Sequence, residues 1–380
     1  MAKAPIISVA MPAYNCAAYL PAAIDSILDQ TVKDFEFIID TTGSTDDSTK
    51  VAADYAKKDK RIIHHSDSEN KLMPTKLNRA IKVARGKYVA RMDGDDISVK
   101  NRFELQLDYL SKHPEISVLG TNMLRMDEAG NTFNRYQIFP THDEIVASTV
   151  QGISGMAHAT VIMPTAALRA IGGYRTQFVS AEDYDLWLRL IRAGYRFANV
   201  DEPLYYYRRH TANATKDLWY EMSLLTVLMR LSHRDVLAGK PDPLEHLKKE
   251  DIKVELLRSL CHSPEEIINN HSGVLFGIVS QTAHKQNHDL MKQAVYTMQQ
   301  MFNNAPSGEV QKNVLDFFAA IQTEHLVLPP DMCKLFFHFY YIALPLSRHI
   351  TPEGRNKVLA QMVRAGLYQD ANLLDIKWRQ

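Results

Sequence analysis

The feature that most constrains the fold of this chain is an alternation of short apolar runs with amphipathic stretches over residues 6–109. The strand-like runs are residues 6–11, 35–39, 61–65 and 88–92. The helix-like stretches lie around residues 20–28, 51–55, 72–84 and 105–109. Strands and helices that alternate through short connections predict a parallel sheet covered by helices. Asn15 is expected to cap the first helix, and Gly86 to terminate the helix over residues 72–84.

Polar clusters follow three of the predicted strands. They occupy residues 12–15, 41–44 and 93–96, each directly after an apolar run. In open α/β sheets the ligand crevice lies at the carboxyl ends of the strands. We therefore expect these three segments to converge on one edge of the sheet.

The character of the chain changes after residue 215. Strand signals fade, and amphipathic helical stretches continue to the end, with a Ser-Pro-Glu-Glu helix start at residues 263–266. The sequence predicts an α/β domain over residues 1–215 and an all-α domain over 216–380. Acceptor binding, homo-oligomerisation and membrane docking stay open as roles for the second domain.

Charge and cysteine usage narrow the classes of partner and compartment. The chain carries 44 basic and 44 acidic side chains, so a neutral balance gives no electrostatic reason to expect nucleic acid as a partner. Cys16, Cys261 and Cys333 form no CxxC pair and no disulfide framework, which is typical of a reducing cytoplasm. We expect a cytoplasmic protein, and peripheral contact with the inner face of the membrane stays open.

Two acidic segments are candidates for chemistry. Residues 93–96 read Asp-Gly-Asp-Asp directly after a strand, and carboxylates there suit Mg²⁺ or Mn²⁺, although an acidic loop that caps a helix would look the same. A helix that starts near residue 181 would place Glu182 and Asp183 in its first turn. A carboxylate there can accept the proton of an attacking hydroxyl, and the alternative is charge that favours the helix dipole.

An ordered set of short motifs resembles the family-two glycosyltransferases of the GT-A fold over residues 7–210. The matching pieces are residues 7–15, 30–31, 35–36, 43–46, 77–79, 86–96, 102 with 106, 172–174, 182–185 and 207–210. The expected fold is therefore a GT-A-type nucleotide-binding sheet with flanking helices, followed by the all-α domain.

The resemblance also implies roles for individual residues. The nucleotide-sugar site would use Pro12, Ala13, Tyr14, Asn15, Asp40, Thr42, Asn78, Arg91, Asp93 and Gly94. Mn²⁺ or Mg²⁺ would be held by Asp95 with Asp93 and His210, and a surface histidine is an equal interpretation of His210. Asp183, supported by Glu182, would be the base of an inverting single displacement.

The activity implied is transfer of one sugar from a nucleotide-diphosphate donor, with a UDP-sugar favoured, to a glycan or lipid-linked acceptor. The Gln-x-x-Arg-Trp signature of processive synthases is absent, and surface-polysaccharide or lipopolysaccharide assembly is the natural setting. One alternative is a catalytically weak GT-A fold that serves as a binding or scaffolding module. A nucleotidyltransferase would need a glycine-rich phosphate loop, and residues 12–15 contain no glycine.

One departure from the family pattern concerns the base pocket. Similar sequences carry two aspartates before Gly-Ser-Thr-Asp, and here Thr41 and Thr42 occupy those positions, with Asp40 just upstream. A threonine hydroxyl can bond a base edge more weakly than a carboxylate. Asp40 would share a face with Thr42 if the strand continued, and could then compensate.

This departure yields a prediction for Thr42→Asp. A charge-assisted hydrogen bond contributes about 1.5–3 kcal/mol against about 0.5–1.5 kcal/mol for a neutral one, so donor affinity should change about tenfold. Affinity rises if the pocket offers the carboxylate a donor, and falls if the carboxylate stays unpaired. Calorimetry with a panel of nucleotide diphosphates measures this. Identical affinities for every nucleotide would remove Thr42 from the base pocket.

Overall fold

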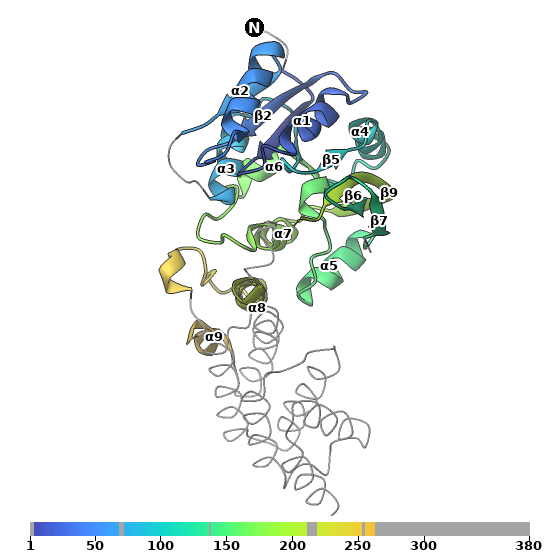
Figure 1. Cartoon of the computed structure of the whole chain (residues 1–380). Coiled ribbons are helices and arrows are strands. Elements are labelled where there is room, and N and C mark those ends of the chain that lie inside the picture. The colour runs from blue at the N-terminus through green and yellow to red at the C-terminus, as the bar shows by residue number, and fades with distance from the viewer. Residues whose placement is uncertain (1–3, 68–71, 137, 211–218, 253–254, 263–380) are drawn as a thin grey trace, which may run out of the picture. The chain divides into compact units, whose positions relative to one another are not determined.

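The computed structural model describes residues 4–67, 72–136, 138–210, 219–252 and 255–262 (Figure 1). The helices predicted after residue 262 lie outside these residues. The chain divides into two units, and the first consists of Met1–Asn213 together with Ser232–Lys249. The predicted domain boundary at residue 215 stays a prediction, and the sheet with the α-helices between residues 20 and 192 belongs to the first unit.

Within the described residues, nine strands form one sheet. They are β1 (Ile7–Pro12), β2 (Phe35–Asp40), β3 (Ile62–His65), β4 (Tyr88–Arg91), β5 (Ile97–Ser98), β6 (Val118–Met126), β7 (Thr132–Arg135), β8 (Ile162–Pro164) and β9 (Phe197–Arg208). The order across the sheet is β3-β2-β1-β4-β8-β6-β9-β5, with β7 paired to β6. All six residues of β1 and of β2 are buried, as expected for strands covered on both faces.

The helices cover both faces of this sheet (Figure 1). They are α1 (Leu20–Leu28), α2 (Ser48–Lys58), α3 (Met73–Val83), α4 (Arg102–Lys112), α5 (His142–Val150), α6 (Thr165–Ala170) and α7 (Glu182–Arg192). Further along the chain, α8 (Trp219–Leu237) begins in the second unit and ends in the first, and α9 (Glu255–Leu260) belongs to the second unit. Side chains of α1, α2 and α4 share one apolar core with the sheet, and those of α3, α5, α6 and α7 share the other. No helix in the described part of the chain is long and apolar enough to cross a bilayer.

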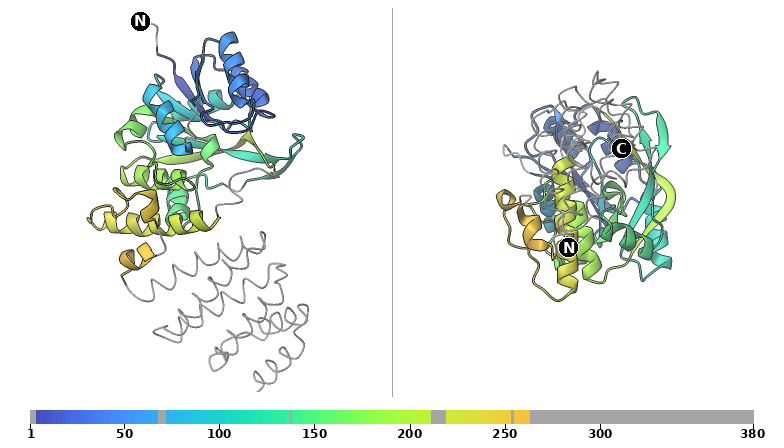
Figure 2. Two further views of the ribbon diagram at one scale, coloured as in Figure 1. Left: turned by 60° about the vertical axis from the view of Figure 1, so that its left-hand side comes forward. Right: turned by 90° about the horizontal axis from the view of Figure 1, so that it is seen from below.

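The prediction of a parallel sheet holds for only part of it. Strands β3, β2, β1 and β4 are parallel, as the alternation with helices indicated. β8 then runs antiparallel to β4 and β6, whereas β6 and β9 are parallel. β8 has only three residues, too few for an apolar period to reveal it. The β6–β7 hairpin, teal in Figure 2, projects beyond the helices, and every residue of β7 is exposed.

Two predicted helix-capping residues were wrong, although the ranges of both helices were predicted to within one residue. The N-cap of α1 is Tyr19, and Asn15 lies upstream in a left-handed conformation with φ 48°, where its side chain joins another loop. α3 ends at Val83 with Ala84 as its cap, so Gly86 lies beyond the helix. A Cβ atom at Gly86 would lie 2.5 Å from the backbone nitrogen of Ser8, so the close approach of β1 explains the glycine.

Candidate active site

The loops that follow β1, β2 and β4 meet at one edge of the sheet, which we call the ligand rim (residues 12–15, 41–46 and 92–96). The backbone N–H of Ala13 donates to the carbonyl of Asp40 at 2.9 Å. The Asn15 Oδ1 accepts from the backbone N–H of Thr45 at 2.8 Å. A Cβ atom on Gly94 would lie 3.0 Å from that of Ala13. The three polar segments that follow the strands therefore converge, as the sequence indicated.

Asp40 and Thr42 are both held by Arg79 of α3. β2 ends at Asp40, whose Oδ1 accepts from the backbone N–H of Thr42 at 3.0 Å. Arg79 Nη1 donates to Thr42 Oγ1 at 3.0 Å and lies 3.3 Å from Asp40 Oδ2. Its other nitrogen, Nη2, donates to Asp67 Oδ2 at 3.0 Å. Sequence reasoning assigned no role to Arg79, although it lies in one of the family motifs.

A buried lysine supports the loop after β1. Lys76 Nζ donates to the carbonyl of Ala13 at 2.8 Å and lies 5.4 Å from the ring centre of Tyr14. Burial lowers the pKa of Lys76, and the charge of Asp40 opposes that shift. Tyr14 is 50% exposed. Lys76 was not predicted, because a lysine within a helical pattern usually faces solvent.

The buried Arg91 pairs with the first carboxylate of the acidic segment. Arg91 is 3% exposed and forms an ion pair with Asp93. Burial acts to lower the pKa of Arg91, but Asp93 together with Tyr205 and Tyr174 raises it above its ordinary value. Burial also raises the pKa of Asp93, and Arg91 acts against that rise. The Asp93 N–H donates to the Tyr205 hydroxyl at 3.1 Å, which ties this loop to β9.

The end of β9 brings His210 to Asp95. His210 Nε2 lies 2.9 Å from Asp95 Oδ2, and the His210 ring lies 5.2 Å from that of Tyr19. Arg208 fixes the same loop, because its Nε donates to the Asp95 carbonyl at 2.9 Å and its N–H to Asp96 Oδ1 at 2.7 Å. The residues that the structure describes contain no group of three or more histidine, cysteine or carboxylate side chains gathered to hold a metal. Asp95 and His210 offer one oxygen and one nitrogen ligand.

Glu182 and Asp183 open α7, as the sequence predicted. Burial, then the neighbouring Asp183 charge, raises the pKa of Glu182 to about 8. Burial also raises the pKa of Asp183. The N–H of Tyr184 donates to Asp183 Oδ1 at 2.8 Å, and this hydrogen bond acts to lower the pKa. The Arg91 cation favours the ionised form of both carboxyl groups. The carboxylates after β4 and those of α7 therefore lie within electrostatic reach of one buried guanidinium.

Asn78 is engaged with the backbone of the loop before α7. Its Oδ1 accepts from the N–H of Tyr174 at 2.8 Å, and its Nδ2 donates to the Tyr174 carbonyl at 2.7 Å. Gly173 has φ 70°, and a Cβ atom there would lie 2.4 Å from Asn78 Oδ1. The Asn78 amide thus holds the loop in place and has little hydrogen-bonding capacity left for a ligand.

Known proteins are similar to this chain in sequence and in fold. The sequence pattern of glycosyl transferase family 2 matches residues 8–172. The putative glycosyltransferase EpsE of Bacillus subtilis (strain 168) is 38% identical over 216 residues, which cover 54% of this chain and 73% of EpsE. WfaP of Escherichia coli, named UDP-Glc:alpha-D-GlcNAc-diphosphoundecaprenol beta-1,3-glucosyltransferase, is 27% identical over 236 residues, which cover 61% of this chain and 90% of WfaP.

Among solved structures, residues 1–349 of S. aureus TarS in complex with UDP align with a TM-score of 0.50 and 17% identity, covering 95% of this chain and 92% of TarS 1–349. At that identity the likeness concerns the fold alone. The sheet with its flanking helices is of the GT-A type, and the protein is a glycosyltransferase. The chain belongs to glycosyltransferase family 2, as the ordered motifs indicated.

The raised pKa of Glu182 predicts a pH-dependent stability. The folded-state pKa of about 8 exceeds the ordinary 4.5, so the protonated form stabilises the fold. That contribution is complete below about pH 4.5 and is lost as the pH rises through about 8. Relative to wild type, Glu182→Gln should therefore gain on the order of a few kcal/mol in free energy of unfolding between pH 5 and pH 9. Urea unfolding at both pH values measures this, with the exposed Glu202→Gln as control. An equal change in the free energy of unfolding of Glu182→Gln and of wild type between pH 5 and pH 9 would contradict the prediction.

Proposed function

We propose that this family-two enzyme is an inverting, metal-dependent, non-processive glycosyltransferase. It moves one sugar from a nucleotide-diphosphate donor, with a UDP-sugar favoured, to a glycan or lipid-linked acceptor. The nucleotide would lie along the ligand rim, against Pro12, Ala13, Tyr14 and Asn15, with its base toward Asp40 and Thr42. Assembly of surface polysaccharide or lipopolysaccharide is the setting that suits such an activity.

The observation that carries the proposal is that one buried guanidinium, that of Arg91, acts electrostatically on two sets of carboxylates. Arg91 pairs with Asp93 at the end of β4, and its charge also acts on Glu182 and Asp183 at the start of α7. A transferase needs a place for a diphosphate leaving group and a base for the incoming hydroxyl, on opposite sides of the reacting carbon. Carboxylates from two separate elements around one buried cation supply both.

The residues at the acidic loop fit a divalent cation, Mn²⁺ or Mg²⁺. Mg²⁺ keeps several waters and is bound through one or two carboxylates plus substrate phosphates, so a site with few protein ligands is suitable. Asp95 would be the principal ligand, with Asp93 and His210 completing the protein share. When bound, the cation would neutralise the charge that develops on the leaving diphosphate. Arg208 fixes the backbone at Asp95, because its guanidinium donates a hydrogen bond to the Asp95 carbonyl.

Asp183 would accept the proton of the acceptor hydroxyl. Its raised pKa brings the carboxylate nearer to the pH at which a base is most effective, because catalytic efficiency is greatest when pKa and working pH are close. Glu182, with a pKa of about 8, is largely protonated at neutral pH and can donate a hydrogen bond beside the base. Attack from this side displaces the diphosphate from the opposite face, which inverts the anomeric centre.

The relatives support the choice of substrates. EpsE is named a putative glycosyltransferase, and the name of WfaP specifies UDP-glucose as donor and a diphosphoundecaprenol-linked sugar as acceptor. A lipid-linked diphosphate acceptor agrees with a polymer-building role. A screen of nucleotide sugars against lipid-linked and soluble glycan acceptors tests the proposal. Metal-dependent nucleotide binding without transfer would instead favour the binding module considered above.

Asp95→Ala should abolish transfer and leave the fold intact. The side chain lies at the loop after β4, 26% exposed, and so its removal leaves the two apolar cores unchanged. Transfer should fall at least 10²-fold, with the midpoint of thermal unfolding close to wild type. The exposed Asp108→Ala on α4 is the matched control. Full wild-type activity in excess chelator would contradict the metal requirement.

Asp183→Asn should slow the chemical step by about 10²–10⁴-fold with little change in donor affinity. Asparagine keeps the size and most hydrogen bonds of aspartate but cannot take a proton. Single-turnover rates and calorimetry with the donor separate the two effects. Asp143→Asn is the control, since Asp143 is the second residue of α5 as Asp183 is of α7. Donor binding that collapsed while turnover survived would exclude Asp183 as the base.

A further inference from the structure

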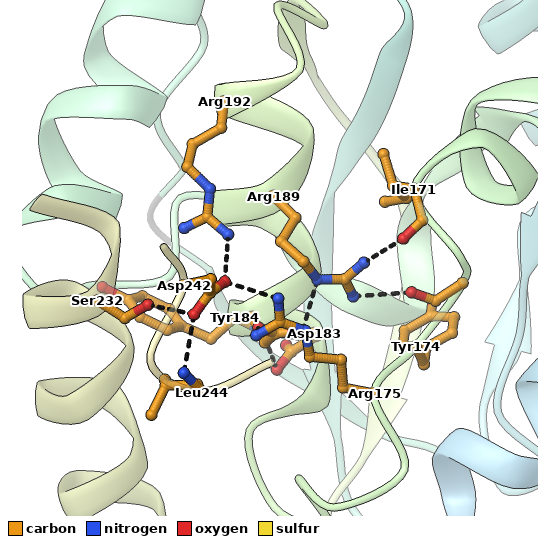
Figure 3. A network of polar contacts seen from close by, with 12 residues as sticks. Ile171, Tyr174, Arg175, Asp183, Tyr184, Arg189, Arg192, Ser232, Asp242 and Leu244 are labelled. Carbon is orange, nitrogen blue, oxygen red and sulfur yellow. Dashed lines mark hydrogen bonds and ion pairs between the residues drawn. The ribbon is translucent and has the colours of Figure 1, made fainter. Parts of the chain in front are cut away.

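A buried polar network connects α7 with a segment far along the chain (Figure 3). We propose that Asp242 is a positioning residue that fixes the first turn of α7 through Arg175, and so orients Asp183 toward the acceptor. This inference rests on the proposed role of Asp183 as the base. The family pattern ends at residue 172, so the catalytic helix and its support both lie beyond it.

Both oxygens of Asp242 are occupied. Oδ2 lies 2.6 Å from Arg175 Nη2 and 3.1 Å from Arg192 Nη2, while Oδ1 accepts from Ser232 Oγ at 2.7 Å and from the Leu244 N–H at 3.0 Å. Its side chain is 10% exposed. Burial acts to raise the pKa of Asp242, but the hydrogen bonds from Arg175, Ser232 and Leu244 bring it to about 2. The carboxylate therefore stays ionised throughout the neutral range.

Arg175 connects Asp242 to α7. Its Nη1 lies 3.5 Å from Asp185 Oδ1, and Asp185 Oδ2 accepts from Arg189 Nε at 2.8 Å. Arg189 in turn donates to the carbonyls of Ile171 and Gly173 at 2.9 and 2.7 Å. Asp185 lies in the same first turn as Asp183. The turn that carries the proposed base is thus held to the preceding loop by two guanidinium groups.

The charges of the network explain why Asp242 matters. Among the residues that the structure describes, three guanidinium groups, of Arg175, Arg189 and Arg192, share two carboxylates, those of Asp185 and Asp242. Without the Asp242 charge, Arg175 and Arg192 lose the carboxylate that both of them contact. Asp185 then becomes the remaining carboxylate for Arg175, in competition with Arg189. Arg189 would then lose its hydrogen bonds to the carbonyls of Ile171 and Gly173.

A second contact ties the same segment to the loop before α7. Gln177 Nε2 donates to the carbonyl of Leu244 at 3.2 Å, and Leu244 is buried. Residues 232–244 therefore touch this loop at both Arg175 and Gln177. Because the ligand rim is built by the loops after β1, β2 and β4, the network should affect Asp183 and leave donor binding alone.

The test is Asp242→Asn in the full chain, compared with Glu245→Gln, an exposed carboxylate in the same segment. Asp242→Asn should lower kcat about 10- to 100-fold with the donor KM within about twofold, since small misplacements of a catalytic group have effects of this size. The acid limb of the kcat–pH profile should move to lower pH, because a loosened first turn exposes the base to water. Nucleotide-binding stoichiometry by calorimetry corrects for inactive protein.

Hydrogen exchange gives a readout that needs no activity. Amides of residues 171–177 and of the first turn of α7 should exchange faster in Asp242→Asn than in wild type or Glu245→Gln, with residues 12–15 unchanged. Should Asp242→Asn fail to fold, Arg175→Lys provides the same comparison, since lysine keeps the charge but cannot span both carboxylates. Asp242→Glu should restore part of kcat.

Unchanged exchange over residues 171–185, or an unchanged acid limb with a normal binding stoichiometry, would overturn the inference. A wild-type enzyme that transferred sugar through a base other than Asp183 would instead overturn the proposed function. In that case the exchange data would still show whether Asp242 holds α7.

Discussion

The Arg91 guanidinium lies at the end of β4, almost wholly removed from water, and a buried cation is costly unless anions surround it. Asp93 pairs with it directly, and the charges of Glu182 and Asp183 reach it from α7. The surrounding carboxyl groups are buried as well, so their pKa values rise. The Arg91 cation thus offsets part of the cost of burying several carboxyl groups close together.

The neighbouring carboxylates of Asp95 and Asp96 have different surroundings. Asp95 is partly exposed, and its Oδ2 lies 2.9 Å from Nε2 of His210. Asp96 is buried, accepts the N–H of Arg208 and has a raised pKa because of burial and then the charge of Asp95. Asp96 therefore serves to hold β9 against the acidic loop. Adjacent residues of one motif differ because the end of β9 covers one and leaves the other open.

Two polar networks contact the loops and the helix that carry the site residues. Arg79 and Lys76 of α3 hold the loops after β2 and β1, each through hydrogen bonds to the rim itself. Asp242 pairs with Arg175, and Arg175 lies 3.5 Å from Asp185 of α7. Sequence patterns predicted neither network, because an arginine or lysine in a helix and an aspartate in a loop are ordinary solvent-facing residues until their neighbours are known.

The sequence by itself determined the strand–helix alternation, the edge of the sheet where polar loops meet, and the family, since apolar period and ordered motifs are local properties. It also placed Glu182 and Asp183 in the first turn of α7. Only the tertiary structure decided the mixed direction of β8, the bond from Asn78 to the loop before α7, and the partners of Thr42. These depend on contacts between residues far apart in the chain, for which a short segment carries no periodic signal.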